Sequence, residues 1–230
     1  MERLYINQIK DHLDTEIKLQ GFVENFRNGK AMAFIVLKDI TGKVQITIEK
    51  EKHPELEDVL AQITPDSVIT VYGTAVASEY VKMGGMEVFP TQIVLESAAD
   101  ALPIIREGIP ATKKKAAVER SAIDSRLDYR WIDLRTERNQ LIFKAQTVLA
   151  KALRDFLLER NFLEIHTPKL IGAASESGSD VFAVKYFDTT AYLAQSPQFY
   201  KQMAMASGFE RIFEVGPVFR AEKSFTSKHT

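Results

Sequence analysis

The 230-residue sequence contains no cysteine. Disulfide bonds and metal sites built from thiolates are therefore excluded. No apolar run approaches the roughly 20 residues that a membrane-spanning helix needs, and the N-terminus lacks the apolar core of a signal peptide. These absences predict a cytoplasmic protein without a membrane-bound part.

The sequence also lacks an excess of charge of one sign, because its formal net charge is −1. With 45% hydrophobic and 27% charged residues, it has the balance of an ordinary globular protein of one large or two small domains. Acidic residues prevail in residues 1–100 and basic residues in the remainder. Binding of nucleic acid would therefore depend on local patches or on stacking and not on bulk charge.

The first 100 residues carry the signals of five strands. Apolar and polar residues alternate, with turn residues such as Asn28-Gly29 and Gly84-Gly85 between the runs. The pattern predicts strands over 17–23, 32–37, 44–48, 68–77 and 87–95, and a helix over 54–62. Five strands with a helix after the third is the order of an OB-fold, a small barrel that commonly binds oligonucleotides. Any small five-stranded barrel gives similar signals.

The composition changes after Ser97, where prolines, a glycine and the lysines at 113–115 indicate a linker with some helix. Residues 101–130 are therefore predicted to be a linker or hinge. From Glu137 to Arg160, apolar residues recur at helical spacing. A strand over 162–166, which Pro168 stops, is predicted next. The apolar stripe suits a helix in a protein core as well as one in an interface.

Two short segments of the second half carry residues suited to nucleotide and carboxylate chemistry. In Phe219-Arg220-Ala221-Glu222, a strand would place Arg220 and Glu222 on one face. The arginine fork suits a phosphate, and the glutamate accepts hydrogen bonds from an exocyclic amine. An isolated pair of this kind is more commonly a surface ion pair.

In the other segment, Ser196 and Pro197 suit the N-cap and the first position of a helix. Gln198 and Lys201 then share a face near its N-terminus, where anions are favoured. The arrangement suits a small dicarboxylate, although solvated side chains are the commoner fate of such residues.

Together these segments resemble the class II aminoacyl-tRNA synthetases. The stretch from Phe219 to Glu222, with the Ser/Thr-rich loop and His229 after it, is similar to motif 2 of that family, and residues 195–202 are similar to its amino-acid pocket. The resemblance runs from about Ile17 to Thr230 and is closest to the aspartyl enzymes of the archaeal and eukaryotic type. Nothing resembles motif 3, so we expect the N-terminal part of a longer enzyme that is inactive on its own.

The resemblance implies an α+β fold: a five-stranded OB-fold barrel (1–100), which binds the anticodon, and then the start of an antiparallel-sheet catalytic domain (131–230). It implies that aspartate is activated with ATP and transferred to tRNA(Asp). Arg220 would be catalytic, Arg220, Glu222 and His229 would bind ATP, and the ligands of Mg²⁺ would lie beyond residue 230, with no metal site within this chain.

The resemblance also assigns the remaining site residues. Aspartate would be held by Glu176, Ser196, Gln198 and Lys201, with Lys201 facing its side-chain carboxylate. The anticodon would be read by Phe34 and Gln45, with Arg27 and Glu87 as weaker candidates, although Phe34 also suits the barrel core. Pro168 would lie in the interface of a homodimer. Asparaginyl-tRNA ligation and a non-catalytic RNA-binding protein remain the alternatives.

Overall fold

The computed structural model describes residues 1–107, 117–173, 181–219 and 221. Contacts within the chain divide it into two units, Met1–Tyr129 and Arg130–Thr230.

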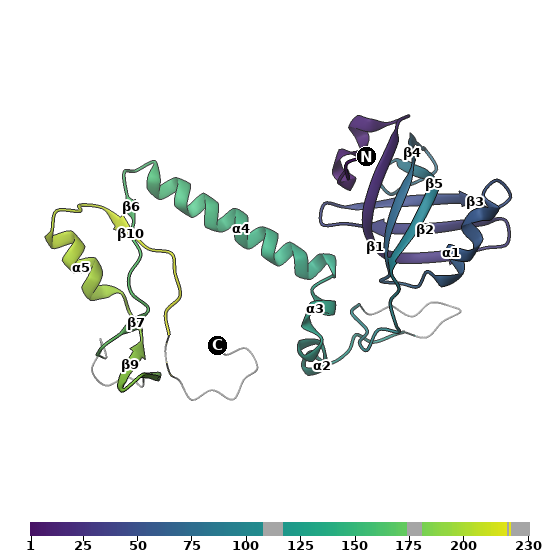
Figure 1. Ribbon diagram of the computed structural model, residues 1–230. Coiled ribbons are helices and arrows are strands. Elements are labelled where there is room, and N and C mark those ends of the chain that lie inside the picture. Colours follow the sequence, from purple (N-terminus) through teal and green to yellow (C-terminus); the bar gives the residue numbers. More distant parts are fainter. Residues whose placement is uncertain (108–116, 174–180, 220, 222–230) are drawn as a thin grey trace. The chain divides into compact units, whose positions relative to one another are not determined.

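The first unit contains the five predicted strands, closed into a barrel in the order β1-β2-β3-β5-β4 (Figure 1). The strands are β1 (Glu16–Asn28), β2 (Met32–Lys38), β3 (Lys43–Glu49), β4 (Val68–Ala77) and β5 (Met86–Ser97). Neighbours pair antiparallel except β3 and β5, which are parallel, and β4 returns to pair with β1. The short helices η2 (Pro54–Leu56) and α1 (Glu57–Gln62) lie between β3 and β4. The predicted OB-fold is confirmed.

The barrel encloses the hydrophobic core of this unit. Alternate residues of every strand point inward, and Ile35, Ile46 and Val71 are fully buried. The N-terminal 3-10 helix η1 (Ile6–His12) adds Ile6 and Ile9 to the same core. Period-two alternation in the sequence therefore corresponds to the inside and outside of a closed barrel.

The register of β4 against β5 shifts between Tyr72 and Gly73. A Cβ atom on Gly73 would lie 2.3 Å from the carbonyl oxygen of Phe89, closer than any side chain tolerates. The strands approach each other this closely because glycine occupies the position.

The described part of the predicted linker makes contacts within the first unit. Ile104 is buried, and Arg106 Nη2 lies 2.9 Å from Oδ1 of the buried Asp66. The helix α2, at Ile123–Asp128, lies within the predicted linker, for which some helix was expected. The lysines at 113–115 lie outside the described residues.

The second unit begins with the short helix α3 (Arg130–Asp133) and the long helix α4 (Glu137–Leu158). The Thr136 hydroxyl caps α4 by accepting a hydrogen bond from the backbone N–H of Asn139 at 3.3 Å. Beyond its C-terminus, Asn161 adopts a left-handed conformation with φ 60°. The helix therefore begins as predicted and ends two residues earlier.

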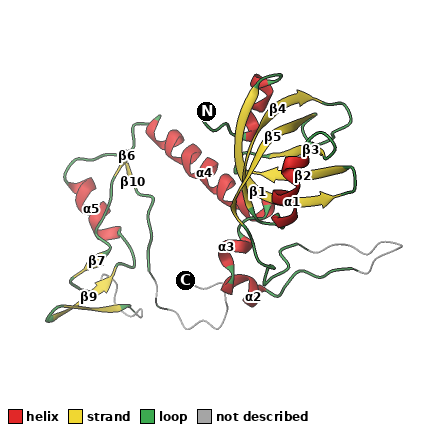
Figure 2. Ribbon diagram, turned by 45° about the vertical axis from the view of Figure 1, so that its right-hand side comes forward, coloured by secondary structure: helices red, strands yellow, loops and turns green. Residues whose placement is uncertain are grey.

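Two small sheets and a helix follow α4 (Figure 2). The strands β6 (Leu163–Glu164) and β10 (Ile212–Phe213) form a parallel pair, and β7 (Leu170–Ile171), β9 (Thr189–Leu193) and β8 (Ala183–Tyr186) form an antiparallel sheet. The helix α5 spans Gln198–Ala206. In the part of the chain that the structure describes, no helix combines the length and apolar character needed to cross a membrane.

The strand predicted over 162–166 is longer than the two-residue β6. The ladder ends early because the backbone N–H of Thr167 donates to the side chain of Glu214 at 3.1 Å and not to a neighbouring strand. A tertiary contact therefore sets this boundary.

Candidate functional site

The outer face of the barrel carries the residues predicted to read the anticodon. Phe34 is half-buried and alternates with Ala33 and Ile35, which are fully buried in the core. Its side chain therefore points out of the barrel, and the alternative that places Phe34 in the core is wrong. Gln45 alternates in the same way with buried neighbours on β3.

Strand pairing aligns the outward side chains in two adjacent rows. One row crosses β1, β2 and β3 through Arg27, Phe34 and Thr47. The other crosses β1, β2, β3 and β5 through Asn25, Val36, Gln45 and Glu87. Residues as distant in sequence as Asn25 and Glu87 thus meet on one surface.

A β-bulge shapes the edge of this surface. The pairing of β1 with β2 steps from Val23 opposite Leu37 to Asn25 opposite Val36, which leaves one extra residue, Glu24, in β1. The extra residue changes the phase of β1, so that the exposed Asn25 lies beside the outward Val36. Bulges commonly re-aim side chains next to functional sites.

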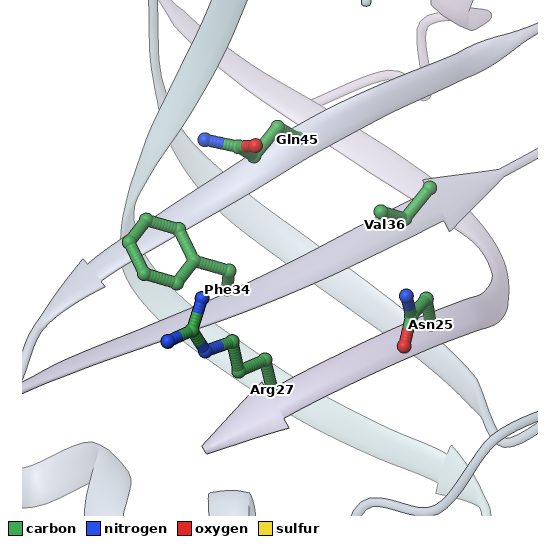
Figure 3. Close-up of a pocket in the computed structure, with 5 residues that line it drawn as sticks. All are labelled: Asn25, Arg27, Phe34, Val36 and Gln45. Carbon is green, nitrogen blue, oxygen red and sulfur yellow. The ribbon is translucent and has the colours of Figure 1, made fainter. Parts of the chain in front are cut away.

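The two rows line an open pocket of about 350 Å³. It is lined by Asn25, Arg27, Phe34, Val36 and Gln45, which Figure 3 shows projecting from three neighbouring strands. An aromatic ring, an amide and a guanidinium at one hollow can stack on a base, read its edge and neutralise a phosphate. The structure therefore brings three of the four predicted RNA-reading residues together as lining of one pocket.

Glu87, the fourth, is connected to the pocket by hydrogen bonds. Gln45 Nε2 donates to Thr47 Oγ1 at 3.0 Å, and Thr47 Oγ1 donates to Glu87 Oε2 at 2.5 Å. Sequence analysis missed Thr47, although its position two residues after Gln45 places both on one face of a strand. Asn25 and Val36 were missed as well.

The predicted amino-acid pocket is only partly described. Pro197 occupies the N-cap of α5, and the helix begins at Gln198, so the prediction that Ser196 is the N-cap is wrong. Ser196 Oγ instead accepts a hydrogen bond from the backbone N–H of Gln198 at 3.2 Å, which forms a turn before the helix. Gln198 is exposed and Lys201 half-buried in the first turn of α5.

The remaining predicted site residues are Glu176, Arg220, Glu222 and His229, and all four lie outside the described residues. Among the residues that are described, no group of three or more acidic or histidine side chains is arranged to hold a metal ion.

A partly buried ion pair joins the segment after β6 to the residue that follows β10. Lys169 Nζ lies 2.6 Å from Glu214 Oε1, and the Thr167 hydroxyl donates to the same oxygen at 2.9 Å. Burial raises the pKa of Glu214, but the hydrogen bonds from Lys169 and Thr167 and the charge of Lys169 outweigh it and leave that pKa below its ordinary value. Sequence analysis gave no sign of this cluster, because its members lie 45 residues apart.

The helix α4 exposes apolar side chains along most of its length. Leu141, Val148 and Leu149 are each more than three-fifths exposed. They recur with Ala145, Ala152 and Phe156 on one side of the helix. Pro168, predicted to lie in a dimer interface, is also exposed.

Two family profiles match the chain. "OB-fold nucleic acid binding domain" matches residues 17–96, and "tRNA synthetases class II (D, K and N)" matches residues 122–230. The fold and the matched profiles define an OB-fold barrel of the nucleic-acid-binding kind, followed by the start of a class II catalytic domain. Residues 122–230 belong to the class II tRNA synthetases of the D, K and N group, and residues 17–96 to the OB-fold nucleic acid binding domains.

Within the D, K and N group, the chain is similar to aspartate–tRNA ligases. An aspartate–tRNA(Asp/Asn) ligase of Methanopyrus kandleri is 46% identical over 216 residues, which cover 93% of this chain and 48% of the relative. An aspartate–tRNA(Asp) ligase of Picrophilus torridus is 42% identical over 225 residues, covering 97% of this chain and 51% of the relative. The chain thus spans about half the length of the curated relatives it matches.

Solved structures of the same group match closely. Asparaginyl-tRNA synthetase from Pyrococcus horikoshii in complex with asparaginyl-adenylate has a TM-score of 0.85 at 30% identity, covering all of this chain and 50% of that one. Aspartyl-tRNA synthetase from Entamoeba histolytica has a TM-score of 0.76 at 29% identity, covering all of this chain and 48% of that one.

Proposed function

We propose that the protein ligates aspartate to tRNA(Asp). The observation that carries this proposal is the 46% identity to an aspartate–tRNA(Asp/Asn) ligase, which extends over 93% of the chain and so includes both the barrel and the catalytic part. The reaction serves protein synthesis, and we place the enzyme in the cytoplasm.

The reaction needs no nucleophilic side chain. The α-carboxylate of aspartate attacks the α-phosphate of ATP, pyrophosphate leaves, and aspartyl-adenylate forms. A hydroxyl at the 3′ end of the tRNA then attacks the carbonyl carbon, and AMP leaves. Catalysis rests on positioning and on neutralising charge at phosphorus, the role proposed for Arg220. Glu222 and His229 complete the ATP site, and Mg²⁺ would add charge neutralisation through ligands outside these 230 residues.

Amino-acid choice is assigned to the N-terminal turns of α5. Lys201 meets the side-chain carboxylate of aspartate, and Gln198 and Ser196 bind near its α-carboxylate, while Glu176 binds its α-amino group. A lysine matched to the neutral amide of asparagine would lose its ionic partner, which disfavours asparagine. Lys201 thus favours aspartate, although one close structural match is an asparaginyl enzyme.

The barrel, residues 1–100, is proposed to bind the anticodon loop of tRNA(Asp). Phe34 stacks on an unpaired base, Gln45 reads its edge, and Arg27 neutralises the adjacent phosphate. The support is that all three side chains line one open pocket on the outer face. The same residues would serve a non-catalytic RNA-binding protein.

We further propose that the enzyme is a homodimer that buries the apolar side of α4 together with Pro168. The support is the exposed apolar surface of this helix, which a monomeric protein seldom leaves uncovered.

The proposal is tested by aspartate-dependent pyrophosphate exchange in a full-length enzyme that carries these 230 residues. Lys201→Leu should lower the rate about ten- to a hundredfold, because a hydrogen bond to a charged group contributes about 1.5–3 kcal/mol. Lys185→Leu, which removes an exposed lysine from β8, is the matched control and should leave the rate unchanged. Exchange at the wild-type rate in Lys201→Leu would contradict the assignment of aspartate.

A further inference from the structure

We infer that Thr47 and Glu87 hold the side-chain amide of Gln45 in one orientation, so that the barrel distinguishes bases whose hydrogen-bonding edges are inverted copies of each other. Uracil and cytosine form one such pair, and guanine and adenine form another, because the two bases of each pair exchange donors and acceptors along the edge. The inference rests on the proposed function, because it assumes that Gln45 reads a base of the anticodon loop.

The direction of the hydrogen bonds follows from the chemistry of the three groups. A carboxylate only accepts, and a threonine hydroxyl has a single proton. Because Thr47 Oγ1 lies 2.5 Å from Glu87 Oε2, its proton belongs to that contact. Toward Gln45 the hydroxyl therefore presents lone pairs alone, and the Gln45 atom 3.0 Å away must be the amide nitrogen.

The opposite orientation is disfavoured. Rotating the amide by half a turn would place the Gln45 carbonyl oxygen against the lone pairs of Thr47, where two acceptors would face each other without a proton. Thr47 is only 4% exposed, so solvent has little access to relieve that contact. Gln45 itself lines the open pocket, which leaves its carbonyl oxygen and its second N–H available to a ligand.

A fixed amide separates bases that a rotating amide would confuse. Where cytosine and adenine present an amino donor, uracil and guanine present a carbonyl acceptor, and the adjacent ring nitrogen changes from acceptor to donor. A primary amide that rotates freely matches both patterns, because half a turn exchanges its own donor and acceptor. An amide that cannot rotate matches one pattern. Against the other pattern it places donor opposite donor and acceptor opposite acceptor. Thr47 and Glu87 are therefore positioning residues for base recognition.

The barrel contains a second arrangement of the same kind, which supplies a control. Gln20 Nε2 donates to Thr70 Oγ1 at 2.9 Å, and Thr70 Oγ1 donates to Glu96 Oε1 at 2.6 Å. Thr70 is 1% exposed, so the two threonines are buried alike. None of these three residues lines the pocket of Gln45. Removing the Thr70 hydroxyl eliminates the same two kinds of hydrogen bond as removing the Thr47 hydroxyl. It leaves the proposed base-reading amide of Gln45 unchanged.

The experiment measures binding of fluorescent anticodon stem-loops of tRNA(Asp) to the 230-residue chain. Beside the natural loop, each anticodon base is replaced in turn by its inverted counterpart, uracil by cytosine, cytosine by uracil and guanine by adenine. Wild type should lose about five- to a hundredfold in affinity at one position, the usual range for a bidentate base contact. The discrimination ratio is the affinity for the natural loop divided by that for the substituted loop. In Thr47→Val this ratio should fall to below about threefold, while the natural loop still binds.

Three further variants make the result specific. Thr47→Ser keeps the hydroxyl and should keep the wild-type ratio, and Thr70→Val should keep it too. Glu87→Ala frees the Thr47 proton to bond either end of the amide, so the ratio should fall although Thr47 is intact. This variant also carries the test if Thr47→Val does not fold, as judged by circular dichroism.

The outcomes separate the inference from the proposed function. Wild-type discrimination that persists in Thr47→Val or Glu87→Ala would overturn the inference and leave anticodon binding standing, as would a wild type that binds all loops equally. A wild type that binds no stem-loop would overturn the proposed function of the barrel, and the inference with it.

Discussion

The single residue on which anticodon binding should depend most is Phe34. Its ring lies on the outer face of the barrel, where it is available to stack, and it makes no part of the buried core. Phe34→Ala should weaken binding of the tRNA(Asp) stem-loop by about 1–3 kcal/mol, the usual contribution of a base stacked on an aromatic ring. Fluorescence anisotropy with the 230-residue chain measures this directly.

The control for this prediction is Phe187→Ala, which removes an equally large ring that is 80% exposed in the second unit. Its affinity for the stem-loop should equal that of wild type. Unchanged binding in Phe34→Ala, with the fold intact, would show that the pocket on β1, β2 and β3 is not where RNA binds.

The residues on the outer face of the barrel were not equally predictable from the sequence. Phe34, Gln45 and Arg27 were found through a family resemblance, and their alternation along strands agreed with an outward position. Thr47 was missed because threonine is ordinary in strands, and its role depends on Glu87, 40 residues away. That contact exists only because β3 and β5 pair in one register. Neither the register nor the bulge at Glu24 leaves a pattern in the sequence.

Among the elements, the junction between β6, β7 and β10 depends on one carboxylate. Glu214 binds Thr167 and Lys169, and its native pKa lies below the ordinary value of 4.5. Its stabilising contribution is therefore complete above about pH 4.5 and is lost as the pH falls through the lower native pKa. Glu214→Gln should destabilise the protein at pH 7, by about 1–3 kcal/mol.

Urea unfolding of wild type and Glu214→Gln at pH 7 and at pH 3.5 tests whether the stability that Glu214 contributes falls with pH. Glu210→Gln, which replaces an exposed glutamate nearby, is the control. The difference between wild type and Glu214→Gln should shrink at the lower pH, because the unfolded-state carboxylate takes up a proton before the native one does and wild type thereby loses stability. A difference that stays constant or grows on acidification would show that the Lys169 pair does not stabilise the junction.

Elements were predicted well where the pattern is local. The barrel strands alternate with period two and the helix α4 repeats with period 3.6, so both were located within a few residues, except that β1 runs to Asn28 and not only to residue 23. The exceptions have tertiary causes. The strand β6 ends early because Thr167 bonds to Glu214, and α5 begins one residue late because Ser196 forms a turn with Gln198.

At the scale of the whole molecule, the large apolar surface of α4 is the feature that most needs a partner. Within the described part of the second unit, the helix exposes Leu141, Val148 and Leu149 on one side. Its other side carries Arg154, which bonds to Glu164 of β6 at 3.0 Å. The side that faces its own unit is thus distinct from the side proposed to meet a second copy.

The 230-residue chain should therefore be a dimer or larger in solution, and Leu149→Glu should shift it toward the monomer. A charge introduced into the centre of an apolar interface must be desolvated without a partner on assembly, which typically costs several kcal/mol. Sedimentation equilibrium over a range of concentrations measures the change in association. Thr147→Glu adds the same charge on the opposite side of the helix, about 160° away, and should leave association intact. If the wild-type chain sediments as a monomer at every concentration, the apolar side of α4 does not bind a second copy, and its exposure requires cover from elsewhere in the enzyme.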